Sequence, residues 1–485
     1  MQRSAMKKLV EWKDSARRKP LLLLGARQVG KTWLMQEFGR SYFKNTAYIR
    51  FDKNQQMRAA FERDYDIPRI LLSIQVHAGF SIVPGETLIV LDEIQSCPAA
   101  LTSLKYFCED AREYHVVAAG SLLGVGDQQG TGFPVGKVDR MYLYPMTFSE
   151  FLNATGNEPM QELIRKRDWQ MLKDFEDKFA DLLRYYYFVG GMPEAVDTFV
   201  ATGDFNRVRA VHKTLLADFR DDFGKHAPRD LKPKIEKIWD SIPAQLAREN
   251  KKFIYSDVQT GAGARELEPA MRWLLDAGLI THVWRVSKPS IPLDSYKDDA
   301  FKVFFLDVGL LAAKTDLGAK VIIDGNRIFQ EFKGALTEQY VQQQILAETG
   351  LHSFYWTAGK NKAEVDFLIE TDSGIIPLEV KAERNLQAKS LKAFCEKFRP
   401  DIAVRTSMHY YYRQTVSYPP PENEKLPREY QLIDIPLCAI CTICEEEASP
   451  MPEITTCGGG NTSAKSRPPR QGDACRKRSA HGDRY

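Results

Sequence analysis

The sequence predicts an α/β fold that begins with a parallel sheet covered by helices, continues through helical segments and ends in a second α/β domain. Short apolar runs alternate with helical patterns over the first 150 residues, and this alternation returns from Ile328 to Ile435. Alternating strands and helices favour a parallel sheet, because the connecting helices lie on its two faces. The length of 485 residues also exceeds what one hydrophobic core normally serves.

The first domain is expected over residues 1–155. A helix is predicted over residues 1–18, and Pro20 then precedes Leu21–Leu24, an apolar run typical of a buried strand that ends at a glycine-containing turn. The elements expected after this turn are a helix from Lys31 or Thr32, a strand at Ala47–Phe51, a helix near Arg69–His77, a strand at Thr87–Leu91, a helix near Leu101–Ala111 and a strand at Val116–Ala119.

Four further segments are predicted. Residues 156–230 form a helical region, interrupted at Gly190-Gly191-Met192-Pro193. Residues 231–327 form a winged-helix-like module, since an apolar helix face stops at Gly278 and a strand-like run follows. Residues 328–437 form the second α/β domain. Residues 438–485 lack periodicity and predict a disordered tail.

The composition excludes the disordered and fibrous classes of protein. Apolar residues make up 44% and charged residues 27%, as in ordinary globular proteins, and the net charge of +3 gives no information about a polyanion partner. Residues 458–485 hold seven Lys or Arg and two Asp, so the basic excess belongs to the tail. With no membrane-spanning apolar run and no signal peptide, we expect a soluble, cytoplasmic protein without a disulfide framework.

A phosphate-binding loop is the strongest motif in the sequence. It matches G-x-x-x-x-G-K-[ST] and lies between a predicted strand and a predicted helix, the context that this motif requires. Backbone N–H groups of the loop and of the helix N-terminus would wrap a phosphate, Lys31 would reach the terminal phosphates and the Thr32 hydroxyl would ligate magnesium. The predicted nucleotide-binding residues are Gly25, Ala26, Arg27, Gln28, Val29, Gly30, Lys31 and Thr32.

The second half of such a site is an acidic pair at the end of another buried strand. Asp92 and Glu93 follow the apolar strand that begins at Thr87. Asp92 would hold magnesium through water, and Glu93 would act as general base on the attacking water. Ser121, after the next strand, is predicted to sense the γ-phosphate; the alternative is a plain turn residue. The motifs therefore predict an ATP hydrolase that binds ATP and Mg²⁺.

Several strings together resemble prokaryotic AAA-type ATP-binding proteins that have a C-terminal domain of uncertain function, similar in fold to restriction endonucleases. The strings are Leu23–Thr32, Val90–Gln95, Ala119–Gly124, Phe133–Asp139, Tyr144–Leu152 and Gly190–Val196. The resemblance covers about residues 5–437. It implies ATP binding by a P-loop NTPase sheet and a restriction-endonuclease-like fold for the second α/β domain, without implying a physiological role.

Four residues of the second α/β domain predict a further metal site. Asp366, Glu379 and Lys381 form a D…E-x-K pattern on two expected strands, and Glu338 lies on a preceding helix. Glu379 and Lys381 share a strand face because side chains alternate. Asp366 and Glu379 would hold magnesium beside a scissile phosphate, with Lys381 and Glu338 assisting catalysis. The alternative is a nuclease-like fold that only binds, since exposed strands often produce this pattern.

Weaker patterns leave alternatives open. The helix at Ala264–Ala277 is either a duplex-binding element or a packing element, because it mixes basic and acidic residues. Cys438, Cys441, Cys444 and Cys457 have ligand-like spacing, which favours either a metal site or an incidental tail. An arginine finger is not assignable, although Lys137 and Arg140 lie in a suitable stretch.

Two functions from different classes follow from these patterns. The first is an ATP-driven enzyme that acts on DNA or RNA through the nuclease-like domain. The second is an ATP-dependent regulatory switch that controls a protein partner and uses an inactive nuclease-like domain as a binding surface. A second copy of the chain is a further candidate partner, and no membrane partner is expected.

Overall fold

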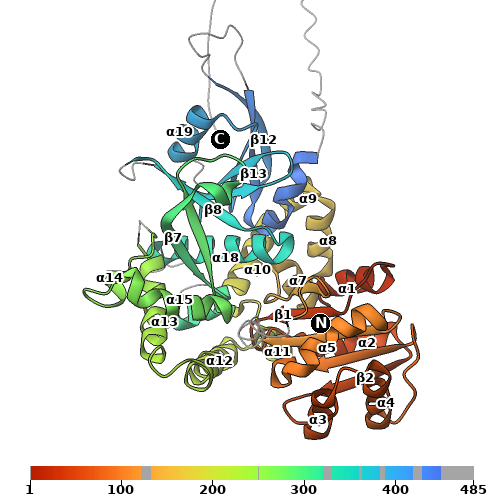
Figure 1. The fold of residues 1–485 in the computed structure, drawn as a ribbon. Helices are drawn as coiled ribbons and strands as arrows, with labels where there is room; N and C mark the ends of the chain where they lie inside the picture. The colour runs from red at the N-terminus through yellow and green to blue at the C-terminus, as the bar shows by residue number, and fades with distance from the viewer. Residues whose placement is uncertain are drawn as a thin grey trace, which may run out of the picture. The chain divides into compact units, whose positions relative to one another are not determined.

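The computed structural model describes residues 2–121, 133–248, 251–319, 330–359, 363–382, 388–418 and 429–448. Figure 1 shows two sheets, one near each end of the described chain, with helices between them in the sequence. Across the described ranges, helices long and apolar enough to span a bilayer are absent.

The first sheet has five parallel strands in the order β2-β3-β4-β1-β5. Its elements are α1 (Ala5–Asp14), β1 (Leu21–Gly25), α2 (Lys31–Tyr42), β2 (Asn45–Arg50), α3 (Gln55–Arg63), α4 (Ile67–Ala78), β3 (Thr87–Asp92), η1 (Ile94–Ser96), α5 (Pro98–Asp110), β4 (His115–Ser121) and β5 (Asp139–Tyr142). The predicted parallel α/β sheet is confirmed, with most element ends shifted by a few residues.

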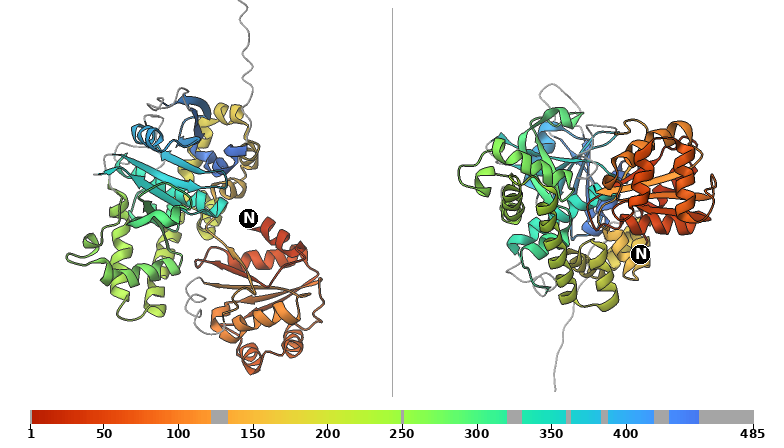
Figure 2. Two further views of the ribbon diagram at one scale, coloured as in Figure 1. Left: turned by 45° about the horizontal axis from the view of Figure 1, so that its top comes forward. Right: turned by 60° about the horizontal axis from the view of Figure 1, so that its bottom comes forward.

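Helices lie on both faces of the first sheet (Figure 2), and alternation along the apolar strands divides the side-chain packing between these faces. Leu21 and Leu23 of β1 pack with α1 and α2, whereas Leu22 and Leu24 pack with α3, α4 and α5. All four leucines are buried, so β1 is the interior strand that holds the following loop in place. The run of four leucines is therefore explained by burial on both sides of the sheet.

Helices follow the first sheet. They are α7 (Phe148–Ala154), α8 (Glu158–Lys166), α9 (Trp169–Asp174), α10 (Glu176–Val189), α11 (Pro193–Thr202), α12 (Phe205–His226), α13 (Lys232–Leu246), α14 (Tyr255–Val258) and α15 (Ala264–Asp276). The glycines between α10 and α11 permit close backbone approach: Gly190 has a φ of 69°, and a Cβ on Gly191 would collide with the carbonyl oxygen of Met146. The Gly191 N–H donates to Asp307 Oδ2 at 2.7 Å, which fixes this turn against the later part of the chain.

The second sheet has eight strands of mixed direction, in the order β12-β13-β11-β10-β9-β8-β6-β7. Its elements are β6 (Ile280–Val286), η2 (Leu293–Tyr296), β7 (Lys297–Phe305), α16 (Val308–Lys314), α18 (Gln330–Thr349), β8 (Ser353–Thr357), β9 (Glu364–Glu370), β10 (Ile375–Val380), α19 (Lys389–Phe398), β11 (Ile402–Ser407), β12 (Tyr412–Ser417), β13 (Glu429–Pro436) and η5 (Leu437–Ala448). A second α/β domain is thus present, and its sheet is mixed.

The sheet crosses the predicted boundary between residues 327 and 328. The helix, turn and strand expected near Gly278 are present as α15 and β6, and β6 pairs with β7 in an antiparallel ribbon. The other edge of β6 pairs with β8, where Trp284 lies opposite Phe354. The ribbon is therefore part of the C-terminal sheet, because only that pairing satisfies both edges of β6.

The chain stays packed beyond the predicted start of the tail at Cys438. Ile440 and Ile443 of η5 are buried, and the Tyr340 hydroxyl of α18 donates to Leu437 O at 3.0 Å. The difference has a physical cause: apolar residues recur at a helical spacing in this segment, and they cover α18.

Candidate nucleotide-binding site

The predicted phosphate-binding loop joins β1 to α2. Gln28 has a φ of 65° and Gly30 a φ of 94°, so two left-handed residues turn the chain into the helix that starts at Lys31. A Cβ on Gly25 would collide with the carbonyl oxygen of Leu143, which follows β5. The loop therefore places consecutive N–H groups at a helix N-terminus, the geometry that binds phosphate.

Lys31 lies inside this loop. Its Nζ donates to Gly25 O at 2.9 Å and to Ala26 O at 2.8 Å. Burial lowers the pKa of Lys31 to about 8, while the nearby carboxylates of Glu93 and Asp92 act in the opposite direction. The Lys31 ammonium thus bonds to neutral carbonyl groups, and the carboxylates of Asp92 and Glu93 lie nearby without bonding to it. This arrangement leaves the ammonium able to bind an anion.

Asp92 lies at the end of β3, beside the start of α2. The Thr32 Oγ1 donates to Asp92 Oδ2 at 2.8 Å, and the Glu93 N–H donates to Asp92 Oδ1 at 3.0 Å. Asp92 is 3% exposed. A hydroxyl and a carboxylate in contact are oxygen ligands of the kind that Mg²⁺ uses, so these residues fit the predicted metal.

Tyr48 of β2 was not predicted. Its hydroxyl donates to Asp92 Oδ2 at 2.6 Å, so this oxygen accepts from two side chains. Burial, followed by the bond to Asp92, raises the pKa of Tyr48. β2 is the neighbour of β3 in the sheet, but the sequence order of the strands does not reveal their spatial order. In the sequence, the only indication of this contact was a tyrosine near the end of a half-buried strand.

Glu93 follows Asp92 with a φ of 52°, a left-handed conformation that is uncommon for a residue with a side chain. Its Oε2 accepts from Gln95 Nε2 at 2.5 Å. Ser121 at the end of β4 lies opposite Gly25 in the parallel register, whereas its side chain falls outside the described residues. The structure thus brings Lys31, Thr32, Asp92 and Glu93 together at one edge of the sheet.

The side chains of Arg27 and Gln28 turn away from the loop towards α12. Arg27 forms an ion pair with Asp222, and Gln28 Nε2 donates to Asp218 Oδ2 at 2.9 Å. These two loop residues therefore offer their backbone to a nucleotide. Buried Arg3, also not predicted, donates from Nη1 to Val29 O at 2.9 Å and supports the loop from outside; a lone arginine near the N-terminus gave no signal of this contact.

The four residues predicted as a second metal site also gather. Asp366 on β9 accepts from the Val380 N–H at 2.8 Å, next to Glu379. Lys381 Nζ donates to Glu379 Oε1 at 2.6 Å. Glu338 of α18 lies close enough to raise the pKa of both Asp366 and Glu379, although burial is the larger cause for each.

Two further lysines, which the sequence analysis did not single out, join this cluster. Lys302 of β7 is fully buried, with its Nζ 2.6 Å from Glu364 Oε1 and 3.5 Å from Glu338 Oε2. Lys251 forms an ion pair with the other oxygen of Glu338. Lys302 reaches these carboxylates through β7 of the eight-stranded sheet, and Lys251 reaches them from the segment between α13 and α14.

Other predicted features remain apart from these sites. Among the described residues, His, Cys, Asp and Glu side chains form no group of three suited to hold a metal ion. This finding covers the carboxylates Glu338, Asp366 and Glu379 as well as Cys438, Cys441 and Cys444, and Cys457 lies outside the described residues. Lys137 pairs with Glu109, and Arg140 lies over the Phe133 ring. The helix α15 pairs its exposed Arg272 with its own Asp276.

A comparison with known protein families supports an AAA-type domain in the part of the chain that forms the first sheet. Residues 17–152 match the family described as AAA domain. Residues 180–321 match a domain of unknown function (DUF8612), and residues 333–428 match another (DUF4143). No curated protein matches the chain.

Solved structures with detectable likeness include three archaeal proteins. The Walker-type ATPase PABY2304 of Pyrococcus abyssi is 15% identical with a TM-score of 0.39, over 65% of this chain and 95% of that chain. The Orc1 protein of Aeropyrum pernix, solved in complex with DNA, is 12% identical with a TM-score of 0.26, over 64% and 91%. Cdc6p from Pyrobaculum aerophilum is 11% identical with a TM-score of 0.24, over 66% and 93%.

The parallel sheet, the phosphate-binding loop and the family match over residues 17–152 together indicate that this chain contains an AAA-type ATP-binding domain. The chain combines this P-loop NTPase-like domain with a second domain built on a mixed sheet. Residues 333–428 of that second domain match a family whose function is unknown.

Proposed function

We propose that this protein hydrolyses ATP with Mg²⁺ at the loop between β1 and α2. The observation that supports the proposal is the contact of Thr32 with Asp92 beside a lysine that is held only by backbone carbonyls. Hydroxyl, carboxylate and ammonium thus lie together at a helix N-terminus, where a triphosphate and its metal need them.

Each residue of the site then has a distinct task. The loop N–H groups bind the phosphates, and Lys31 leaves its carbonyl partners to stabilise their terminal charge. Thr32 and Asp92 would hold the magnesium, which would neutralise charge on the phosphate oxygens. Glu93 accepts a proton from the attacking water, and Gln95 fixes the orientation of its carboxylate through the 2.5 Å hydrogen bond.

Nucleotide binding and turnover, measured on two variants, test these tasks. Lys31→Ala should lose binding by calorimetry, since the phosphate-facing charge is removed. Glu93→Gln should keep binding while its rate of phosphate release falls about a hundredfold or more, because general base catalysis contributes about that much. Lys53→Ala is the matched control, since Lys53 is an exposed lysine of the same domain. Undiminished turnover in both site variants would refute the assignment.

A second candidate function is magnesium-dependent cleavage of DNA or RNA by a restriction-endonuclease-like domain. The specific observation is that Glu338, Asp366, Glu379 and Lys381, separated by up to 43 positions, meet in one cluster. Lys251 and Lys302 already neutralise part of its charge, so a divalent cation must compete with them. This competition favours the alternative, in which the domain only binds a protein partner and ATP controls the binding.

Cleavage assays separate these two functions. If the domain cuts nucleic acid, the double variant Asp366→Ala plus Lys381→Ala should abolish cleavage and leave ATP turnover at the wild-type rate. Single- and double-stranded DNA and RNA, each with Mg²⁺ and ATP, are the substrates to test. Wild-type protein that leaves all four intact supports the regulatory switch.

A further inference from the structure

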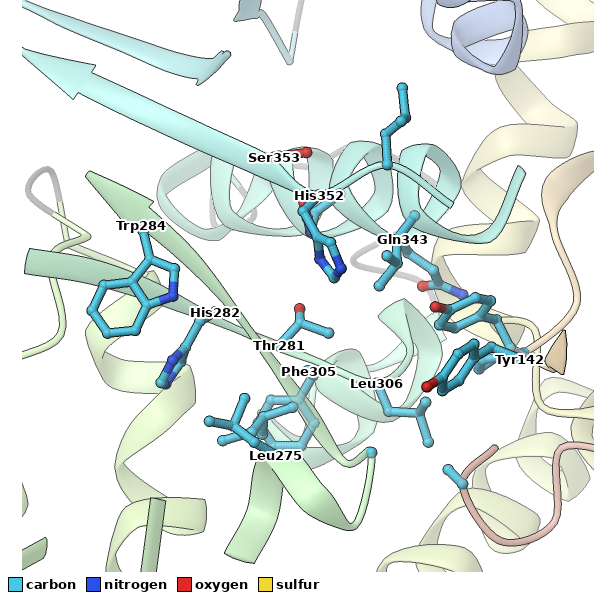
Figure 3. Close-up of a pocket in the computed structure, with 18 of the residues that line it drawn as sticks. Tyr142, Leu275, Thr281, His282, Trp284, Phe305, Leu306, Gln343, His352 and Ser353 are labelled. Atoms are coloured by element: carbon cyan, nitrogen blue, oxygen red, sulfur yellow. The ribbon is translucent and has the colours of Figure 1, made fainter. Parts of the chain in front are cut away.

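A cavity of about 760 Å³ lies beside the phosphate-binding loop (Figure 3). Its walls come from both sheets: the segment from Tyr142 to Pro145 after β5, strand β6, the end of β7, helix α18 and the start of β8. Gly25 and Ala26 form part of one wall, whereas Lys31 and Thr32 are not among the described residues that line it. Cavities of this size hold small organic molecules.

Aromatic rings make up much of the wall. Figure 3 shows Trp284 and His282 of β6 on one side and Tyr142 on the other, with His352 and Phe305 between them. Rings on opposite walls suit a flat ligand, because aromatic faces attract other rings and cations.

The charged side chains at the cavity indicate which charge its ligand can have. Its described lining has two carboxylates, Asp294 and Glu370, and neither lysine nor arginine. Lys297 pairs with Asp294 from outside the lining, and Glu370 Oε2 accepts from the Leu293 N–H. Burial lowers the pKa of His282 to about 4, so this ring is neutral at neutral pH. An anionic ligand such as a nucleotide would have no cation here to offset its desolvation.

We propose that this cavity binds a small aromatic molecule that is neutral or singly positive. The cavity is distinct from the triphosphate site, although Gly25 and Ala26 belong to both. The second sheet supplies most of its aromatic wall, which assigns a ligand-binding role to the ribbon β6–β7 and to α18.

Three indoles of one ring system and different charge test the proposal on the full chain. Tryptamine is a cation, indole-3-acetamide is neutral and indole-3-acetate is an anion. Calorimetry and ligand-observed NMR should detect saturable binding of the first two at one site, with indole-3-acetate at least tenfold weaker. Saturable binding of none of them, or binding of the anion as tight as that of the cation, overturns the proposal.

Two variants locate the binding. Thr281→Phe fills the centre of the cavity and should weaken tryptamine at least tenfold, whereas Thr415→Phe on the exposed edge strand β12 is the matched control. Thermal melting and Mg-ATP affinity verify folding of each variant. Wild-type affinity for tryptamine in a folded Thr281→Phe protein overturns the proposal.

Discussion

Lys31 and Lys302 are both buried lysines beside carboxylates, yet their surroundings differ in kind. Lys31 bonds to two backbone carbonyls and has its pKa lowered to about 8. Lys302 contacts the carboxylates of Glu338 and Glu364, and these raise its pKa above the ordinary value although burial acts against them. The first ammonium keeps capacity for a new anion, whereas the second is already neutralised.

This difference separates a site prepared for a ligand from a cluster that holds a fold together. A neutral partner is readily exchanged for a phosphate oxygen, since no ion pair is broken. A buried lysine between carboxylates is costly to disturb, because each remaining charge loses its partner. The cluster around Lys302 therefore links β7, α18 and β9 whether or not it also has chemistry.

The largest expected effect comes from breaking the Lys302 contacts. Lys302→Met removes this fully buried ammonium from Glu364 and from the buried Glu338, and the free energy of unfolding should fall by about 3 kcal/mol. Urea denaturation measures this change. Lys297→Met on the same strand is the control and should cost less than about 1 kcal/mol, because the pair of Lys297 with Asp294 is exposed. Equal losses in both variants would contradict the comparison.

A smaller effect should appear in the pH dependence of ATP binding. As pH rises through about 8, Lys31 of the free protein loses its proton, so affinity for Mg-ATP should fall up to tenfold per pH unit above that value and be unaffected by this group below it. Calorimetry between pH 7 and 9.5 measures the slope. Lys31→Arg should flatten it, since an arginine stays charged; a wild-type affinity constant up to pH 9.5 would refute the assignment.

The smallest effect concerns Tyr48. Tyr48→Phe removes one of the two hydroxyls that bond Asp92 Oδ2, and ATP turnover should fall about fivefold, corresponding to about 1 kcal/mol for one hydrogen bond. Steady-state phosphate release at saturating Mg-ATP measures the change. Tyr42→Phe, at an exposed position on α2, should keep the wild-type rate. A loss as large as that of Glu93→Gln would mean that Tyr48 has a direct part in the chemistry.

The sequence predicted the first sheet and the position of the loop between β1 and α2 because their signals are local. The buried run of β1, the loop after it and Asp92 at the end of β3 can each be recognised within ten residues. The pairing of β6 with β8 was not predictable in this way, since it joins residues 70 positions apart. Tyr48 and Lys302 depend on such pairings, and hence neither was recognised as part of a site.

The place of β6 inside the eight-stranded sheet restricts how the chain can be shortened. A fragment that ends before α18 would leave the edge of β6 that faces β8 with unpaired N–H and C=O groups. Such edges recruit strands from other molecules, so the fragment should self-associate instead of behaving as an independent module. The regions that match the two families of unknown function, residues 180–321 and 333–428, therefore share one sheet, and neither is a separate structural unit.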